Sequence, residues 1–295
     1  MNVMKQKSMV ALIFIVALLS VSNCQRHSSG PDEIVLDESQ SNLTEKNLQK
    51  ISGIHPGDPD KFSFAVIADS HTDYADLGDV LNDIDQKADV LFVIHAGDFT
   101  DGGWLGEYRG TYQAMSGLTI PYLTVIGNHD ELTRGREIYR KMFGDFNYSF
   151  VFGDCKFVML ECNSTAYFGL PPDLDWLESQ LSDDSLYNLV FVVGHQPPFD
   201  PGWSDQDESR YEQLMQENHV ALSIHGHTHD FEYGEKYNDG VKYLVANDAG
   251  KRSYCTISVD SVTFQVAKVD LNPKQENGKK HFGVAVNSYC ENNTY

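Results

Sequence analysis

The chain has 295 residues, of which 41% are hydrophobic and 22% are charged, and this balance is typical of a globular protein rather than a disordered one. Acidic residues outnumber basic ones by 43 to 22, so the formal net charge is -21. A surface of that charge repels nucleic-acid phosphates, which argues against binding along a nucleic-acid backbone. If the substrate is an anion, something other than basic side chains has to attract it.

The first segment has the pattern of an export signal. Lys5 and Lys7 precede an unbroken apolar run of 11 residues, from Met9 to Leu19, whereas a membrane-spanning helix needs about 20. The run is followed by Ser22-Asn23-Cys24, which resembles the lipobox of bacterial lipoproteins, although Asn23 replaces the usual small residue. We therefore expect residues 1–23 to be an export signal peptide and Cys24 to carry a lipid. Cleavage near this point with a free Cys24 is the alternative.

These expectations predict where the protein is located and how its domains are arranged. The protein would be exported, to the periplasm or the cell surface, and would contact a membrane only through the lipid at Cys24. Residues 24–60 are rich in Ser, Gly, Asp and Asn and have little apolar pattern, which predicts a flexible tether. Residues 61–295 would then form one catalytic domain.

The remaining cysteines have a spacing that matches no zinc or redox signature; they are Cys155, Cys162, Cys255 and Cys290. Cys155 and Cys162 are an odd number of residues apart on a predicted strand, which places them on opposite faces. We expect separate core residues rather than a pair. An exported location permits disulfides, but the sequence does not specify any.

The first part of the catalytic domain alternates strands and helices. Short apolar runs predict buried strands over Phe62–Ala68, Val90–Ala96 and Tyr122–Ile126. Between them, apolar residues at helical spacing predict helices, the first on the face Leu77, Val80, Leu81 and Ile84 and the second around 107–115. This alternation is typical of a mainly parallel sheet with right-handed crossovers.

After Tyr148 the pattern changes to strands separated by only two helical stretches, 174–181 and 209–217. Strands are predicted over 148–152, 156–161, 189–193, 221–225, 242–246, 254–259 and 262–268. So many strands need a second sheet. The predicted fold class is α/β, a four-layer α/β/β/α sandwich of two packed mixed β-sheets with flanking helices.

Polar residues follow these strands directly. They form the sequences Asp69-Ser70-His71, Gly97-Asp98, Asn128-His129-Asp130, Gly194-His195 and Gly226-His227-Thr228-His229. Ligands of open α/β sheets bind beyond the carboxyl ends of strands, so we expect these side chains to meet. Their oxygen and imidazole donors suit two divalent metal ions (manganese, iron or zinc) that share one carboxylate.

In chain order the motifs are D-x-H, G-D, G-N-H-D, G-H and G-H-x-H, and this series resembles the calcineurin-like metallophosphoesterase superfamily from Lys61 to Val269. The resemblance implies that one metal is bound by Asp69, His71, Asp98 and His229. It implies that the second is bound by Asp98, Asn128, His195 and His227, so that Asp98 bridges the two. A shared anion would reduce the repulsion between two cations.

The resemblance also implies a mechanism. A metal-bound hydroxide attacks phosphorus in line, and His129, which is not a ligand, gives a proton to the leaving oxygen. Asp101 resembles the acid that pairs with and orients this histidine in phosphoprotein phosphatases; a simple turn acid is the alternative. In those phosphatases an Arg follows, but Gly102 stands here, which argues against a protein phosphatase. The Gly-Asp-Phe-Thr-Asp-Gly-Gly string is closer to the phosphodiesterase branch.

The predicted function is therefore dinuclear metal-dependent hydrolysis of a small-molecule or lipid phosphate ester, with a lean toward phosphodiesters. A phosphomonoesterase is the alternative within this class. A catalytically silent metal-binding scaffold is the alternative from another class. The sequence does not determine the substrate, the metals or the oligomeric state.

Other residues near the motifs have more ordinary interpretations. Arg134 and Arg136 follow the G-N-H-D loop and could contact phosphate, but solvated positions at a helix start are favoured. Strand residues His95 and His225 are interpreted as buried, hydrogen-bonded core histidines. Four aromatic residues could wall a pocket, although ordinary packing is favoured: Trp104, Tyr108, Phe199 and Trp203.

Overall fold

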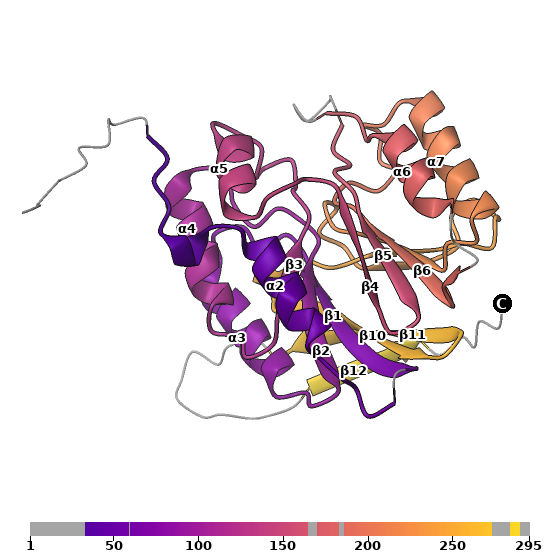
Figure 1. Ribbon diagram of the computed structural model, residues 1–295, viewed down its shortest axis with the longest axis horizontal. Coiled ribbons are helices and arrows are strands. Elements are labelled where there is room, and N and C mark those ends of the chain that lie inside the picture. The colour runs from indigo at the N-terminus through magenta and orange to yellow at the C-terminus, as the bar shows by residue number, and fades with distance from the viewer. Residues whose placement is uncertain (1–32, 59, 165–169, 183–185, 273–283, 290–295) are drawn as a thin grey trace, which may run out of the picture. The chain divides into compact units, whose positions relative to one another are not determined.

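The computed structural model describes residues 33–58, 60–164, 170–182, 186–272 and 284–289 (Figure 1). The predicted signal peptide, Cys24 and Cys290 lie outside these residues. From Leu36 onward the described residues belong to one unit. None of its helices is both long and apolar enough to cross a membrane.

The first sheet has the strand order β12-β11-β10-β1-β2-β3 among the described residues. Strands β1 (Lys61–Ile67), β2 (Val90–His95) and β3 (Tyr122–Thr124) are parallel, as predicted. Helices α3 (Tyr74–Asp85) and α4 (Leu105–Met115) make the crossovers between them. An antiparallel extension follows, made of β10 (Ser253–Asp260), β11 (Thr263–Leu271) and β12 (Val284–Tyr289).

The second sheet has the order β4-β5-β6-β7-β9-β8. Its central strands are parallel: β5 (Cys155–Met159), β6 (Leu189–Val193), β7 (Leu222–His225) and β9 (Lys242–Val245). Its edge strands β4 (Tyr148–Phe152) and β8 (Glu232–Gly234) are antiparallel to their neighbours. Helices α6 (Leu174–Leu181) and α7 (Asp205–Glu217) lie together beside this sheet in Figure 1, while α5 (Gly135–Met142) lies with α3 and α4.

The two sheets pack on a core of alternate strand residues. Phe62, Phe64 and Val66 of β1 belong to it, and Phe64 stacks on Phe92 with ring centroids 5.3 Å apart. The opposite face of the second sheet forms a separate cluster with α6 and α7, in which Val190 and Leu177 take part. Helices therefore cover the outer faces and the two sheets face each other, which confirms the predicted fold class.

The predicted flexible tether is wrong for part of its length. Helix α2 (Leu43–Ser52) lies inside it, and Ile51 belongs to the core between the sheets. The side-chain oxygen of Asn47 accepts a hydrogen bond from the Tyr122 backbone N–H at 3.4 Å, so α2 is joined to the first residue of β3. Few apolar residues are needed for this packing, which is why the composition resembled that of a spacer.

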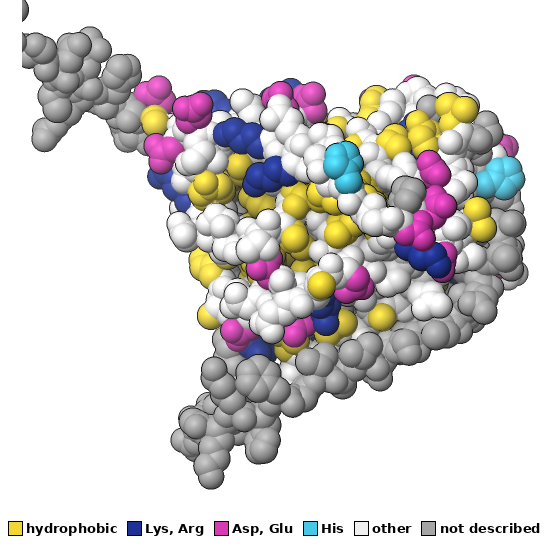
Figure 2. All heavy atoms as spheres, turned by 60° about the horizontal axis from the view of Figure 1, so that its bottom comes forward, with side chains coloured by type: hydrophobic (Ala, Val, Ile, Leu, Met, Phe, Trp, Pro, Cys, Tyr) yellow, Lys and Arg dark blue, Asp and Glu magenta, His cyan; other side chains and the backbone are white. Residues whose placement is uncertain are grey.

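The described cysteines are all buried and unpaired: Cys155, Cys162 and Cys255. Cys155 lies in the core between the sheets and Cys162 in the cluster under α6 and α7, so the prediction of separate core residues on opposite faces is confirmed. Burial raises the pKa of each of these thiols to about 12. On the face drawn in Figure 2, acidic and basic side chains are interspersed rather than gathered in one basic patch.

Candidate metal centre

The carboxyl ends of strands from both sheets meet at one place. Asp69 and His71 follow β1, and Asp98 follows β2. The Asp69 backbone N–H donates to the Gly97 carbonyl and that of His71 donates to the Asp98 carbonyl, both at 3.0 Å, so the first two loops run side by side. From the second sheet come the loops after β6 and β7, which carry His195, His227 and His229.

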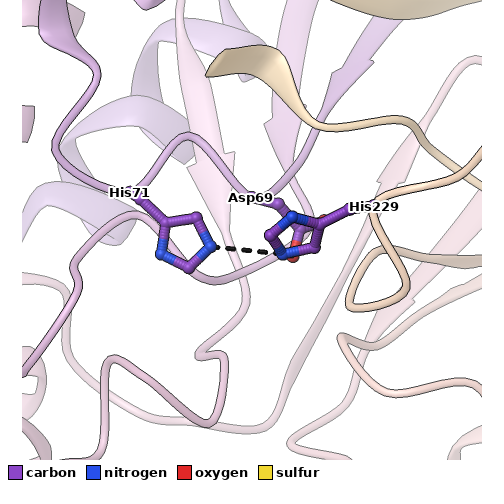
Figure 3. Close-up of side chains that lie close together, drawn as sticks. All are labelled: Asp69, His71 and His229. Atoms are coloured by element: carbon purple, nitrogen blue, oxygen red, sulfur yellow. Dashed lines mark hydrogen bonds and ion pairs between the residues drawn. The ribbon is translucent and has the colours of Figure 1, made fainter. Parts of the chain in front are cut away.

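One group of ligand atoms comes from Asp69, His71 and His229, and these atoms lie within 4.8 Å of one another (Figure 3). The Nε2 atoms of His71 and His229 are 3.3 Å apart. Asp69 Oδ1 is 3.5 Å from His229 Nε2. We call these three residues the outer half of the centre, because 36% of the His229 side chain is exposed.

The other group comes from Asp98, His195 and His227, whose ligand atoms also lie within 4.8 Å of one another. Asn128 Oδ1 joins it, at 3.1 Å from His195 Nε2 and 3.0 Å from His227 Nδ1. Asp98 Oδ2 is 3.1 Å from His195 Nε2. We call these four residues the inner half, because the His195 side chain is fully buried. The seven predicted ligands are thus brought together in two groups, while the bridging role of Asp98 stays a prediction.

Each of the four histidines has an oxygen acceptor at the ring nitrogen that points away from its group. His195 Nδ1 donates to the Ala96 carbonyl at 2.8 Å and His71 Nδ1 donates to the Thr100 carbonyl at 3.2 Å. Two carboxylates face the others: Asp248 Oδ2 is 3.3 Å from His229 Nδ1, and Asp200 Oδ2 is 3.6 Å from His227 Nε2. A proton held at the outward nitrogen leaves the inward nitrogen with a lone pair, which is the tautomer that binds a metal.

The converging atoms are electron-pair donors, so a bound cation would stabilise their close approach. Burial would lower the pKa of His195, but the charge and hydrogen bond of Asp98 outweigh burial and raise that pKa to about 10. Burial raises the pKa of Asp69 to about 7. Burial alone would also raise the pKa of Asp98, but the charge and hydrogen bond of His195 lower it overall. Without metal ions, protons would therefore bind at these donor atoms. The oxygen and imidazole donors fit two divalent metals.

The backbone is strained at most ligand positions. Five of them have a positive φ: Asp69 at 51°, His71 at 45°, Asp98 at 55°, His227 at 75° and His229 at 60°. Non-glycine residues adopt this region rarely and at a cost of about 1–3 kcal/mol each. The side chains of these residues nevertheless converge on the centre, so the surrounding loops hold the backbone in this unfavourable conformation.

Two motif glycines make room for ligands from other loops. A Cβ atom on Gly97 would lie 2.6 Å from Nδ1 of His195, and one on Gly127 would overlap Oδ1 of Asp98. Such distances are shorter than real carbon contacts, so any side chain here would displace a ligand. The glycine of one loop therefore accommodates the ligand of another.

Asp130, the last residue of the G-N-H-D motif, holds two loops together. Its buried carboxylate accepts hydrogen bonds from four backbone N–H groups and one hydroxyl, at 2.9–3.0 Å. The donors are Asp98, Phe99, Thr100 and Gly127. Although burial raises the pKa of Asp130, a set made only of donors favours its charged form.

His129 lies next to the inner half. Its backbone N–H donates to Asp98 Oδ1 at 2.9 Å, and its Nδ1 donates to the backbone carbonyl of Asp101 at 2.8 Å. The Asp101 carboxylate instead lies 3.2 Å from His71 Nδ1 and accepts a hydrogen bond from Thr72. The predicted carboxylate–imidazole pair between Asp101 and His129 is therefore wrong. Asp101 does orient His129, but through its main chain.

Most residues with ordinary interpretations lie as predicted, but Arg136 is not a solvated residue and Trp104 does not pack into the protein. His95 and His225 are buried and hydrogen-bonded to the hydroxyls of Ser70 and Ser223. Arg134 pairs with Glu137. Arg136 is partly buried and pairs with Glu131 and Glu161. Three of the four aromatic residues pack into the protein, whereas Trp104 does not.

Sequence reasoning missed Asp130, Asp200 and Asp248. The sequence shows Asp130 as the last residue of the G-N-H-D motif but does not show that it accepts backbone hydrogen bonds from two loops. Asp248 comes three residues after the end of strand β9, which is parallel to β7, so the rule that identified the ligands would have selected it too. Asp200 follows His195 within the same loop, and no pattern in the sequence distinguishes it from other loop acids.

Comparisons with known proteins agree with this geometry. A family model described as Calcineurin-like phosphoesterase matches residues 62–231, which is more than half of the chain. A "Probable glycerophosphodiester phosphodiesterase GpdQ" of Arcobacter nitrofigilis is 30% identical over 125 residues, or 40% of this chain. The match spans 45% of that relative, which is less than half of its length.

Solved structures share the fold. A dimetal phosphatase from Danio rerio superposes with a TM-score of 0.59 at 16% identity, covering 71% of this chain and 96% of that one. GAP50, described as the anchor in the inner membrane complex of Plasmodium, superposes with a TM-score of 0.54 at 15% identity, covering 71% and 84%. At these identities the likeness concerns the fold alone.

Proposed function

Because this chain belongs to the calcineurin-like phosphoesterase family, we propose that it is a metal-dependent hydrolase of phosphate esters. The observation that carries the proposal is the convergence of seven ligand side chains in two groups, with the outward nitrogen of each histidine facing an acceptor. The outer half would hold one ion and the inner half the other. Two divalent ions, whether manganese, iron or zinc, would polarise phosphoryl oxygens and supply a nucleophile from water at neutral pH.

His129 has the geometry of the proton donor. Because the Asp101 carbonyl can only accept, Nδ1 of His129 carries a hydrogen, and Nε2 is left to hold the proton that the leaving oxygen needs. The hydrogen bond from its backbone to Asp98 holds His129 beside the inner half, and the bond from Nδ1 to the Asp101 carbonyl orients the ring. This arrangement supports general acid catalysis without a covalent enzyme intermediate.

We favour phosphodiesters over phosphomonoesters. The support is the name of the Arcobacter relative, a probable glycerophosphodiester phosphodiesterase, together with the sequence from Gly97 to Gly103. The substrate would be a small-molecule or lipid phosphate ester. The strongly acidic chain provides no broad attraction for such an anion, so the metals would supply the local positive charge.

The test compares bis-p-nitrophenyl phosphate with p-nitrophenyl phosphate, each with added manganese and with a chelator. We expect metal-dependent release of p-nitrophenol, faster from the diester. Asp98→Asn should abolish turnover and lower the metal content, whereas His129→Ala should reduce turnover by about 100-fold with both metals bound. His219→Asn, at an exposed histidine outside the centre, is the control. If metal is bound but neither ester is cleaved, the scaffold alternative is favoured.

The export of this chain and its lipid at Cys24 remain part of the proposal. They rest on the pattern of residues 1–24. Labelling with a radioactive fatty acid in a bacterial host should mark the wild type and leave Cys24→Ser unlabelled. Equal labelling of both would contradict the anchor.

A further inference from the structure

Trp104 is a large aromatic side chain exposed beside the metal centre. Its exposed fraction is 59%, whereas Tyr108 and Trp203 are buried. Phe199 is partly buried and packs against the cluster under α6 and α7. Because the Trp104 indole is not packed in a core, its aromatic face is available to contact a ligand that binds nearby.

The loop that carries Trp104 is held firmly. The Glu107 carboxylate accepts the backbone N–H groups of Gly102 at 3.0 Å and Trp104 at 3.1 Å. Thr133 donates a hydrogen bond to the Gly102 carbonyl at 2.8 Å. The indole lies directly against Gly102, because a Cβ atom there would be 2.8 Å from Trp104 Nε1. The backbone that carries the ring is thus held in place before any ligand arrives, which lowers the entropy cost of ordering this loop on binding.

The same loop reaches His129. The Asp101 carbonyl, which accepts from His129 Nδ1, belongs to the residue before Gly102. Three residues of chain span at most about 11 Å, so the Trp104 backbone lies within that distance of Asp101. In the proposed reaction His129 stands beside the leaving oxygen. A leaving group as large as an aryl ring or a nucleoside extends far enough to contact an indole at this range.

We propose that Trp104 is a specificity residue that stacks on the leaving group of the ester and selects planar, aromatic leaving groups. This inference rests on the proposed function and adds a substrate class to it. The nearby Asp101 carboxylate is half exposed and carries negative charge, so the selected ring would be neutral rather than a second phosphate. Base–aromatic stacking is sequence-tolerant, and any flat ring should benefit.

The kinetic test uses a p-nitrophenyl ester and an ethyl ester of whichever class, diester or monoester, the enzyme cleaves. Trp104→Ala should raise KM for the aryl ester about tenfold and leave KM for the ethyl ester within about twofold. Trp104→Phe should restore most of the aryl preference. Leu186→Ala is the matched control, because Leu186 is 72% exposed and precedes β6, at the end of that strand opposite His195. Equal changes for both esters would overturn the inference.

A binding test separates this inference from the proposed function. Adenosine 5′-monophosphate should quench the indole fluorescence of the wild type and not that of Trp104→Phe, whereas inorganic phosphate should quench neither. If the wild type cleaves no ester, the proposed function fails, and this binding test still decides the role of Trp104. Quenching by the nucleotide that persists in Trp104→Phe would overturn it.

Discussion

The outer and inner halves of the metal centre each combine one aspartate with two histidines, and the inner half adds Asn128, but the two are held differently. In the inner half, His195 is fully buried, and Asp130 fixes the loop of Asp98 through hydrogen bonds to its backbone. In the outer half, His229 is 36% exposed, and its outward nitrogen has the side chain of Asp248 as its acceptor. Each half has one histidine that faces a backbone carbonyl and one that faces a carboxylate, so the halves differ in burial and in the backbone hydrogen bonds to Asp130.

This difference assigns separate tasks. A buried, fixed set of ligands binds an ion tightly and defines where the chemistry takes place. A set with one partly exposed ligand, as His229 is here, allows an ion to exchange and leaves room for substrate to approach. We therefore expect the inner half to fill first when metal is added, and the following experiments test that order.

The largest effect is expected from Asp130→Asn, which removes the frame of the inner half. Whichever way the amide is turned, its NH₂ faces at least two N–H donors that now lack an acceptor, at a cost of about 3–5 kcal/mol in the free energy of unfolding. Urea denaturation in chelator measures this. The exposed Asp145→Asn should change stability by less than about 0.5 kcal/mol, and similar losses in both variants would refute the role of Asp130.

The comparison of His195→Ala with His229→Ala tests the two halves directly. Loss of a residue that only hydrogen-bonds to a metal ligand typically lowers metal affinity about 10–100-fold. His195→Ala removes a ligand itself, so it should weaken the tighter of the two metal sites by more than that. His229→Ala should weaken only the other site. Both affinities can be measured by titration with Mn²⁺, in which the electron paramagnetic resonance signal of free Mn²⁺ is monitored. If both variants weaken the same site, the division into halves is wrong.

Metal affinity should rise with pH, and more steeply for the inner half. His195, with its pKa raised to about 10, holds a proton throughout the neutral range, and the metal has to displace it. The affinity of the inner half should therefore rise about tenfold per pH unit between pH 6 and 8. In the outer half the pKa of Asp69 is about 7, so its contribution levels off above that pH. The hydrogen bond to Asp248 also raises the pKa of His229, but less than that of His195, so the outer half gains affinity over a lower pH range. Mn²⁺ titrations at pH 6, 7 and 8 measure the two slopes, and equal slopes would contradict this assignment.

The smallest effect is expected from Asp248→Ala, which removes the acceptor of His229. The imidazole would lose its fixed tautomer, and the affinity of the outer half should fall about tenfold, with the inner half unchanged. Asp200→Ala, which acts on His227, is the matched variant for the inner half. A fall of inner affinity in Asp248→Ala would show that the halves are not independent.

The ligands could be predicted from sequence because each follows an apolar run. A buried strand that ends in Asp, Asn or His gives both the place of the residue and its chemistry, as at Asp69 and His195. The alternation of strands and helices likewise determined the two sheets. These features are local, so one sequence contains them.

What could not be predicted depends on contacts between distant residues. The role of Asp130 requires that backbone N–H groups some thirty residues away point at its carboxylate. Asp101 was misassigned because its carbonyl, rather than its carboxylate, reaches His129, while the nearby His71 attracts the charged group. Helix α2 has too few apolar residues to reveal its packing.

The close approach of Gly97 to His195 and of Gly127 to Asp98 has a consequence for divergence among related sequences. A methyl group added at one of these glycines would displace a metal ligand in another loop. We therefore expect these motifs to change together rather than one at a time. A relative that keeps every ligand but carries alanine at either glycine position is expected to have lost its metals. In a survey of homologues, these two glycines should therefore separate active from silent members better than the histidines do.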